Sequence, residues 1–199
     1  GSEMCIRDSG MGGHAAGEVA SSIAVNTIGS VFRKSPEGTT AERIERAVQA
    51  SNSAIYEATQ VSGRQGMGST VICAVIEGYR LITAHAGDSR IYRVRKDVIE
   101  RLTHDHSWVQ AQVDNGLLSP EQAETMENRN IITRAVGVED HVEVEVNEHT
   151  METGDRLVLC TDGLHGLIKD PEIAAVASSM SPGEACSKLI AIANERGGP

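Results

Sequence analysis

Aromatic residues are scarce in this chain of 199 residues, which has one Phe, one Trp and three Tyr. The core must therefore consist mainly of Val, Ile, Leu and Ala, and aromatic platforms on which nucleic-acid bases could stack are not expected. Cations are also in deficit, because 18 Lys and Arg oppose 28 Asp and Glu, a net charge of −10. This balance argues against nucleic acid as a partner, since phosphate backbones bind clustered cations. It suits hard divalent cations held by carboxylates.

Long apolar runs and paired cysteines are missing as well. No apolar run approaches the roughly 18 residues that a membrane span needs, so a membrane partner is not expected. The four cysteines are Cys5, Cys73, Cys160 and Cys186, and none belongs to a C-x-x-C pair. Because Cys73 and Cys160 lie in apolar, strand-like runs, we interpret them as buried, reduced thiols. No signal peptide is recognisable, so we expect a cytoplasmic protein.

The hydrophobic pattern predicts one α+β domain. Apolar residues recur at helical spacing over residues 15–32 and again after Thr40, which can cap a second helix. β-branched stretches follow at residues 70–78, 80–95 and 98–103, and their short spacing favours antiparallel strands. The pattern is irregular and helical over 106–137, strand-like over 141–151 and 155–160, and helical again to the end. A sheet core covered by helices is the expected arrangement.

Two short elements that could carry chemistry have ordinary structural explanations. The glycine-rich segment from Ser9 to Glu18 fits either a turn before a helix or an anion or metal site at the start of that helix. Gly87-Asp88-Ser89-Arg90 fits a hairpin turn, because Asp and Ser bond their own backbone there. Taken alone, neither element identifies a function.

Two other elements point more directly to a cation. His104-Asp105-His106 has metal-ligand side chains, but neighbouring residues on a strand face opposite ways, so all three cannot bind one ion. Asp162 follows an apolar strand, and a buried carboxylate there needs a cation or hydrogen-bond donors. Each of these elements is a candidate ligand source with an open structural alternative.

Together with Gly66-Met67-Gly68-Ser69-Thr70, these elements occur in the order found in the PP2C (PPM) metal-dependent serine/threonine phosphatases. The chain resembles the compact bacterial members from about Gly10 to its last residue. The resemblance implies a β-sandwich of two antiparallel sheets flanked by helices, with two Mn²⁺ or Mg²⁺ ions at one end. A water bridging these ions attacks the phosphorus of phosphoserine or phosphothreonine in that family.

The resemblance also implies roles for individual residues. Gly10 would offer its carbonyl to one metal, Asp162 would bind the second, and Asp105 would be the carboxylate of a third. His14 is a candidate proton donor to the leaving group, and residues 107–136 would form a flap beside the active site. The implied partners are phosphorylated Ser/Thr proteins, including a serine/threonine kinase of the same cell, and we expect a monomer.

Three features depart from the family pattern. Ser9 stands where the family has the aspartate that bridges both metals, and Asp8 is a poor substitute because a one-residue shift on a strand reverses the face. The opening strands of the family, with a phosphate-binding arginine and an acidic ligand, have no counterpart here. A closing Asp-Asn motif is also missing. We therefore expect residues 1–9 to be an unrelated leader, and residues 10–199 to be a phosphatase domain incomplete at both ends.

Two hypotheses follow from these departures. The first is a metal-dependent protein serine/threonine phosphatase whose activity is impaired in this chain. The second is a non-catalytic PP2C-like module that binds phosphoproteins or other partners, which the serine at position 9 favours. A metal-free regulatory sandwich is disfavoured because Asp105 and Asp162 are both present.

Overall fold

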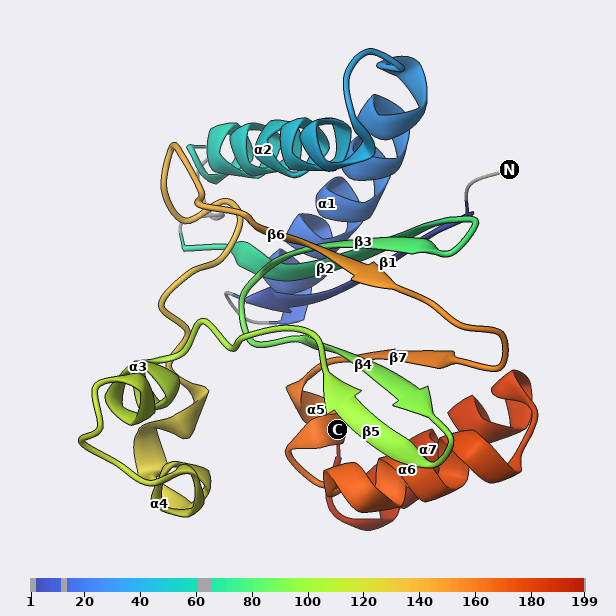
Figure 1. Ribbon diagram of the computed structural model, residues 1–199. Coiled ribbons are helices and arrows are strands. Elements are labelled where there is room, and N and C mark those ends of the chain that lie inside the picture. Colours follow the sequence, from blue (N-terminus) through green and yellow to red (C-terminus); the bar gives the residue numbers. More distant parts are fainter. Residues whose placement is uncertain (1–2, 12–13, 61–65, 199) are drawn as a thin grey trace.

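Two antiparallel sheets, stacked face to face and covered by helices on their outer faces, form the core of the computed structural model (Figure 1). The structure describes residues 3–11, 14–60 and 66–198. The order of layers is helix, sheet, sheet, helix, which confirms the α+β sandwich expected from the sequence. Among the described residues, no helix is both long and apolar enough to cross a bilayer.

The first sheet has the strand order β1-β2-β3-β6, and helices α1 and α2 cover its outer face. Its elements are β1 (Glu3–Met11), β2 (Gly68–Glu77), β3 (Arg80–Ala86), β6 (Glu145–Thr150), α1 (His14–Lys34) and α2 (Thr40–Thr59). The start of α2 is fixed by a capping box, in which Thr39 and Glu42 each bond the other's backbone N–H. Thr40 is thus the first helical residue, and the cap predicted there lies one residue earlier.

The second sheet has the order β5-β4-β7, and helices α6 and α7 cover its outer face. Its elements are β4 (Arg90–Arg95), β5 (Val98–Arg101), β7 (Arg156–Cys160), α5 (Asp162–His165), α6 (Asp170–Ser179) and α7 (Pro182–Glu195). Both long helices carry Pro in the first turn, as the sequence predicted.

Strand β2 is apolar on both faces because it lies between two hydrophobic layers. Val71, Cys73 and Val75 pack toward α1 and α2, whereas Ile72 and Ala74 pack toward the second sheet. Alternation of side chains along a strand puts the two sets on opposite faces. The strand predicted at residues 70–78 is confirmed except for Gly78, which lies beyond the end of β2.

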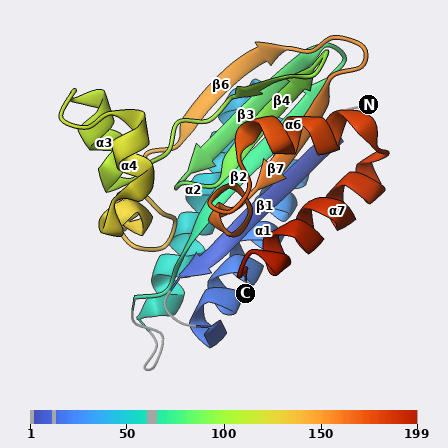
Figure 2. The ribbon, with the colours of Figure 1, turned by 90° about the horizontal axis from the view of Figure 1, so that it is seen from below.

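The expected flap, residues 107–136, lies beside the sandwich rather than within it (Figure 2). It contains α3 (Trp108–Asp114), α4 (Pro120–Thr125) and the 3-10 turn η1 (Glu127–Asn130). An antiparallel bridge between Ser107 and Ile132 joins the two ends of the flap to each other, and a second bridge, between Ser69 and Val136, joins its last residue to β2. The flap therefore starts and ends against the main domain.

Residues 3–9, which the sequence analysis assigned to a leader, lie within strand β1 and pair with β2 from Glu3 to Met11. Met4 and Ile6 pack against the core beneath α1. Strand pairing at a sheet edge uses backbone donors and acceptors, so it makes few demands on side chains. The alternation of Met4 and Ile6 with polar residues is the sequence signal for this strand.

The end of the flap approaches helix α2 so closely that Gly137 is required there. Its φ is +87°, and a Cβ at this position would lie 2.1 Å from Ile55 Cγ2. The Gly137 N–H also donates to Asn52 Oδ1 at 2.7 Å. We expect Gly137→Ala to lower the free energy of unfolding by about 1 kcal/mol for the backbone and about 1–3 kcal/mol more for the clash.

The matched control is Gly116→Ala. Gly116 has φ +70° and nothing within 4 Å of the position of a Cβ, so only the backbone cost applies. Urea unfolding of both variants measures the difference. Equal destabilisation would show that the close approach of Gly137 to α2 does not exist in solution.

Candidate metal centre

One end of the sandwich collects the elements singled out in the sequence. β1 ends there opposite the start of β2, where Gly10 pairs with Ser69. The turn 87–89 joins β3 to β4 at the same end, and Arg90 pairs with Cys160, the last residue of β7. Asp162 follows directly in α5. Antiparallel pairing therefore brings together segments that are far apart in the chain.

Three aspartates lie near this end. Asp88 is buried, and burial raises its pKa to about 6, with further contributions from the negative charges of Asp162 and Asp105. Asp162 is exposed at the start of α5. The charges of both other aspartates act on Asp88, so Asp105 and Asp162 lie at the same end of the sandwich, but the three carboxylates do not come within 4.8 Å of one another in the described residues. We call Asp88, Asp105 and Asp162 the acidic cluster.

Asp105 already has a cationic partner in the protein. Arg90 Nη2 lies 2.6 Å from Asp105 Oδ2, and Arg90 Nε lies 3.0 Å from Oδ1. Arg101 adds a longer ion pair of 3.6 Å to the same carboxylate. Bidentate pairing of this kind is strong and directional. The sequence analysis missed this partner, although Arg90 belongs to the Gly87–Arg90 element that it had singled out.

Gly10 is held in place by a close backbone contact with Gly17 of α1. A Cβ on Gly10 would lie 2.0 Å from the Gly17 carbonyl oxygen, so no larger residue fits. This contact explains part of the glycine-rich segment through packing between β1 and α1. His14 is the first residue of α1. Its side chain lies outside the described part of the structure, so its role as proton donor stays a prediction.

Ser9 and Asp8 face opposite sides of β1. Ser9 pairs with Thr70, whose Oγ1 lies 2.8 Å from Ser89 Oγ in the turn 87–89. Directly paired residues share a face of the sheet, so Ser9 is on the side of that turn and of the acidic cluster. Asp8 is on the side of α1, where its oxygen Oδ2 is buried without a hydrogen-bond partner.

A histidine that the sequence analysis did not consider supports the turn 87–89. His165 Nε2 donates to the Asp88 carbonyl oxygen at 3.0 Å, since a carbonyl can only accept. Burial, together with the positive charge of Arg90, lowers the pKa of His165 to about 4. His165 is therefore neutral at pH 7 and adds no charge to the acidic cluster. Its position three residues after Asp162 is the only sequence signal.

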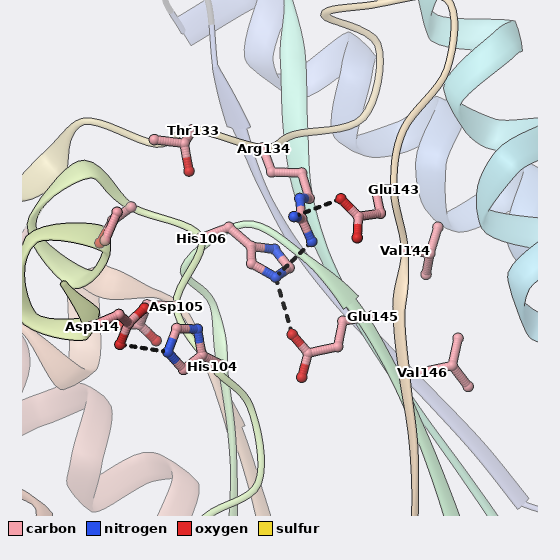
Figure 3. A pocket seen from close by; sticks show the side chains of 12 residues that line it. His104, Asp105, His106, Asp114, Thr133, Arg134, Glu143, Val144, Glu145 and Val146 are labelled. Carbon is pink, nitrogen blue, oxygen red and sulfur yellow. Dashed lines mark hydrogen bonds and ion pairs between the residues drawn. The ribbon is translucent and has the colours of Figure 1, made fainter.

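A cavity of about 490 Å³ opens beside Asp105, between the flap and the segment that leads into β6 (Figure 3). Its polar lining includes His106, Arg134, Glu143 and Glu145. Arg134 pairs with Glu143 at 2.8 Å. The flap thus lines a cavity next to the acidic cluster, and the sequence analysis did not identify Glu143 or Glu145.

Cysteine chemistry is not available at this site. Cys73 and Cys160 are both buried, and burial raises the pKa of both thiols, that of Cys160 to about 12. A thiolate is the reactive form of cysteine, so neither residue is a nucleophile at neutral pH. The prediction of buried, free thiols is confirmed for these two residues.

The donor chemistry of the acidic cluster fits a divalent cation in part. Oxygen ligands suit Mn²⁺ and Mg²⁺, and the negative charges of Asp162 and Asp105 add to the effect of burial on the pKa of Asp88. Asp105, however, shares its carboxylate with Arg90, and position 9 supplies a hydroxyl in place of a carboxylate. The site could hold a cation most directly through Asp162, Asp88 and the backbone at Gly10.

The sequence matches the family described as protein phosphatase 2C over residues 5–190. The chain is 34% identical over 200 residues to the serine/threonine protein phosphatase PstP of Mycobacterium tuberculosis, covering all of this chain and 39% of that protein. It is 36% identical over 196 residues to the serine/threonine phosphatase stp of Listeria innocua, covering 95% of this chain and 77% of that protein.

A solved structure of the catalytic domain of PstP in complex with two manganese ions superposes with a TM-score of 0.88. The identity is 34%, and the match covers 100% of this chain and 84% of that one. The chain thus spans well under half of full-length PstP but most of its catalytic domain. The shared architecture supports the sandwich described above.

The acidic cluster predicts a measurable coupling between two carboxylates. Replacing Asp162 with Asn removes the neighbouring negative charge that raises the pKa of Asp88 most, so this pKa should fall from about 6 toward its ordinary range. Carbon-13 NMR titration of the aspartate carboxyl groups in metal-free buffer measures this change. Asp114→Asn, an exposed change on the flap, is the control. A pKa that moves equally in both variants would contradict the cluster.

Because the Asp8 carboxylate is buried on the α1 face, we expect its removal to increase the stability of the folded protein in a pH-dependent way. Burial raises the pKa of Asp8 in the folded protein, so at pH values above this pKa the ionised carboxylate destabilises the folded state. This destabilisation disappears once the pH is below the pKa of Asp in the unfolded chain, about 3.9, because the carboxyl group is then protonated in both states. Asp8→Asn should therefore raise the urea midpoint at pH 7, and the gain should shrink toward pH 4. A gain of equal size at both pH values would contradict this assignment.

Proposed function

Because the chain belongs to the protein phosphatase 2C family, we propose that it hydrolyses phosphoserine and phosphothreonine in proteins by a metal-dependent reaction. The observation that carries the proposal is the acidic cluster at one end of the sandwich, where Asp88 and Asp162 share negative charge beside the Gly10 backbone. The manganese ions in the related PstP structure support the choice of metal.

Divalent ions, when bound, would supply an activated water as the nucleophile. Asp162 is the direct candidate ligand because it is exposed and, among the residues that the structure describes, forms no ion pair with Lys or Arg, unlike Asp105. The Gly10 carbonyl is the second candidate, since the contact with Gly17 holds it close to the start of α1. His14 is the proposed proton donor to the leaving alkoxide, and Asp105 is the proposed ligand of a third ion.

Arg90 has a defined task in this proposal. It holds Asp105 in one orientation through two of its nitrogens and also donates to Tyr92 Oη at 3.0 Å. A carboxylate that is paired in this way is available to a third ion only when the ion competes with the guanidinium. Asp105 should therefore bind a cation more weakly than Asp162.

Position 9 limits the activity. A bridging ligand must be anionic to hold two cations near one another, and Ser9 offers only a hydroxyl on the face of the acidic cluster. This observation favours the second candidate function, a module that binds phosphoproteins without hydrolysing them. The proposed ligands of either function are phosphorylated Ser/Thr proteins, including a kinase of the same cell.

Exchanging the two residues at positions 8 and 9 tests the proposal with composition and net charge unchanged. Asp8→Ser combined with Ser9→Asp moves the carboxylate from the α1 face to the face of the acidic cluster. We expect the exchange to raise Mn²⁺-dependent hydrolysis of p-nitrophenyl phosphate and of a phosphothreonine peptide at least tenfold. The parent chain should turn over slowly or not at all.

Two further variants in the exchanged background complete this experiment. Asp162→Asn should abolish the gain, because it removes an anionic ligand. Cys160→Ser should retain it, since a thiol with a pKa of about 12 takes no part. Hydrolysis that persists in EDTA would refute the metal-dependent reaction. Phosphopeptide binding without hydrolysis in the exchanged variant would instead support the second candidate function.

A further inference from the structure

His106 is the junction between the acidic cluster, the first sheet and the flap. Its backbone N–H donates to the Gly87 carbonyl at 3.0 Å, and the Gly87 N–H donates back to His106 Nδ1 at 3.2 Å. Its own carbonyl accepts from the Thr133 N–H at 2.9 Å. One residue thus bonds the turn that carries Asp88 and the returning end of the flap, and it directly follows Asp105.

Glu145 controls which ring nitrogen of His106 carries the proton. Glu145 Oε2 lies 3.2 Å from His106 Nε2, and Arg134 Nη1 lies 3.1 Å from the same nitrogen (Figure 3). With the proton on Nε2, the ring donates from Nε2 to Glu145 and accepts at Nδ1 from the Gly87 N–H. With the proton on Nδ1, the ring would only accept, at Nε2, from Arg134. Two hydrogen bonds outweigh one, so the proton belongs on Nε2.

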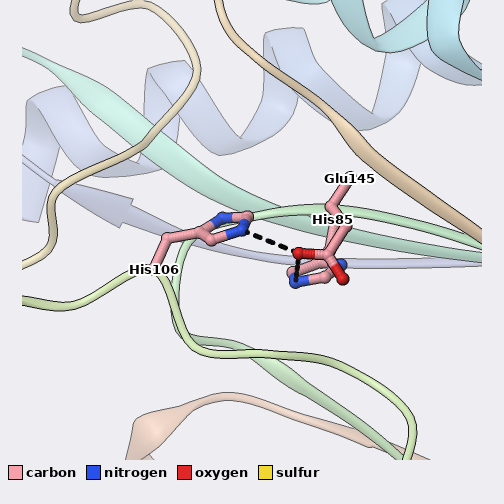
Figure 4. A group of neighbouring side chains, drawn as sticks. All are labelled: His85, His106 and Glu145. Atoms are coloured by element: carbon pink, nitrogen blue, oxygen red, sulfur yellow. Dashed lines mark hydrogen bonds and ion pairs between the residues drawn. The ribbon is translucent and has the colours of Figure 1, made fainter. Parts of the chain in front are cut away.

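His85 completes the arrangement beneath His106. The two imidazole rings are stacked, with centroids 4.7 Å apart and planes 5° apart (Figure 4). His85 Nε2 donates to the His104 carbonyl at 2.8 Å and lies 3.8 Å from Glu145 Oε2. The His85 N–H is therefore directed at the His104 carbonyl, and His106 is the imidazole that donates to Glu145.

These three side chains resemble a metal site in composition but not in geometry. The nitrogens nearest Glu145 carry protons, and a metal ligand must be a bare nitrogen. Lone pairs of an imidazole lie in the ring plane, so two parallel stacked rings cannot both direct them at one ion. The cluster is therefore better explained as a hydrogen-bonded support than as a metal-binding site.

We propose that His106 and Glu145 are positioning residues: Glu145 fixes the His106 tautomer, and His106 thereby holds the Gly87-Asp88-Ser89 turn and Asp105 in the orientation that binds metal. The part of this proposal that concerns metal rests on the proposed function. The part that concerns the turn does not, because it follows from the contacts of His106 alone. Groups that orient metal ligands commonly alter affinity when they are replaced.

Two replacements of His106 separate the role of its two nitrogens. The Oδ1 atom of Asn occupies nearly the position of His Nδ1, so His106→Asn retains an acceptor for the Gly87 N–H. The amide of Gln reaches the position of Nε2 instead, so His106→Gln retains the contact with Glu145 and loses that acceptor. Glu145→Gln, which still accepts from Nε2, and Glu145→Leu, which does not, form the second pair.

Amide hydrogen exchange at Gly87 and Asp88 is the first measurement, made on the chain as it is. We expect roughly tenfold faster exchange in His106→Gln and Glu145→Leu, and little change in His106→Asn and Glu145→Gln. Nitrogen-15 NMR of the imidazole rings should find the His106 proton on Nε2 in the parent chain. Circular dichroism and urea unfolding verify that each variant is folded.

The Mn²⁺ dissociation constant, measured by isothermal titration, is the second measurement. This dissociation constant should rise about tenfold or more in His106→Gln and Glu145→Leu. It should stay near the parent value in His106→Asn and Glu145→Gln. If the parent binds no Mn²⁺ while the exchange pattern holds, the proposed function fails and the positioning role of His106 for the turn stands. Faster exchange in His106→Asn than in His106→Gln would overturn the proposal. A His106 proton on Nδ1, or Zn²⁺ binding that His85→Ala removes, would overturn it as well.

Discussion

Negative charge gathered at one end of a β-sandwich is the constraint on which the site depends. Asp88 is buried near two other aspartates, and burial, together with their negative charges, raises its pKa to about 6. The protein balances only part of this charge, through the pairing of Arg90 with Asp105. The nearby histidine His165 is neutral at pH 7 and contributes none. A divalent cation is the natural counter-charge for what is left.

The surroundings of the acidic cluster are arranged to keep it in one shape. Thr70 bonds Ser89 from one side, His165 bonds the Asp88 carbonyl from another, and His106 bonds Gly87 through both its backbone and its ring. The flap reaches the same turn through His106, whose carbonyl accepts from the Thr133 N–H. A movement of the flap would therefore shift the turn that carries Asp88, because closely packed interiors transmit displacements.

Strand β1 forms regular backbone pairing although two of its side chains, Asp8 and Ser9, suit their surroundings poorly. It pairs with β2 over its whole length, yet it buries an oxygen of Asp8 without a partner and presents Ser9 to the acidic cluster. Edge pairing tolerates this pattern because it depends on backbone groups. The family relationship thus describes the fold of the chain, whereas position 9 presents a hydroxyl in place of a carboxylate to the acidic cluster.

The sequence by itself determined the local structure and the candidate ligands. A β-branched run predicted the strand over 70–78, and the order of short motifs indicated the family, the sandwich and the candidate roles of Gly10, Asp105 and Asp162. The sequence alone could not predict which side chains from distant segments contact one another. Arg90 on Asp105, His165 on Asp88, and Glu145 on His106 join residues from different strands and loops. Such pairs exist only after the strands have paired, because neither spacing nor local propensity encodes which side chains meet at the end of a sheet.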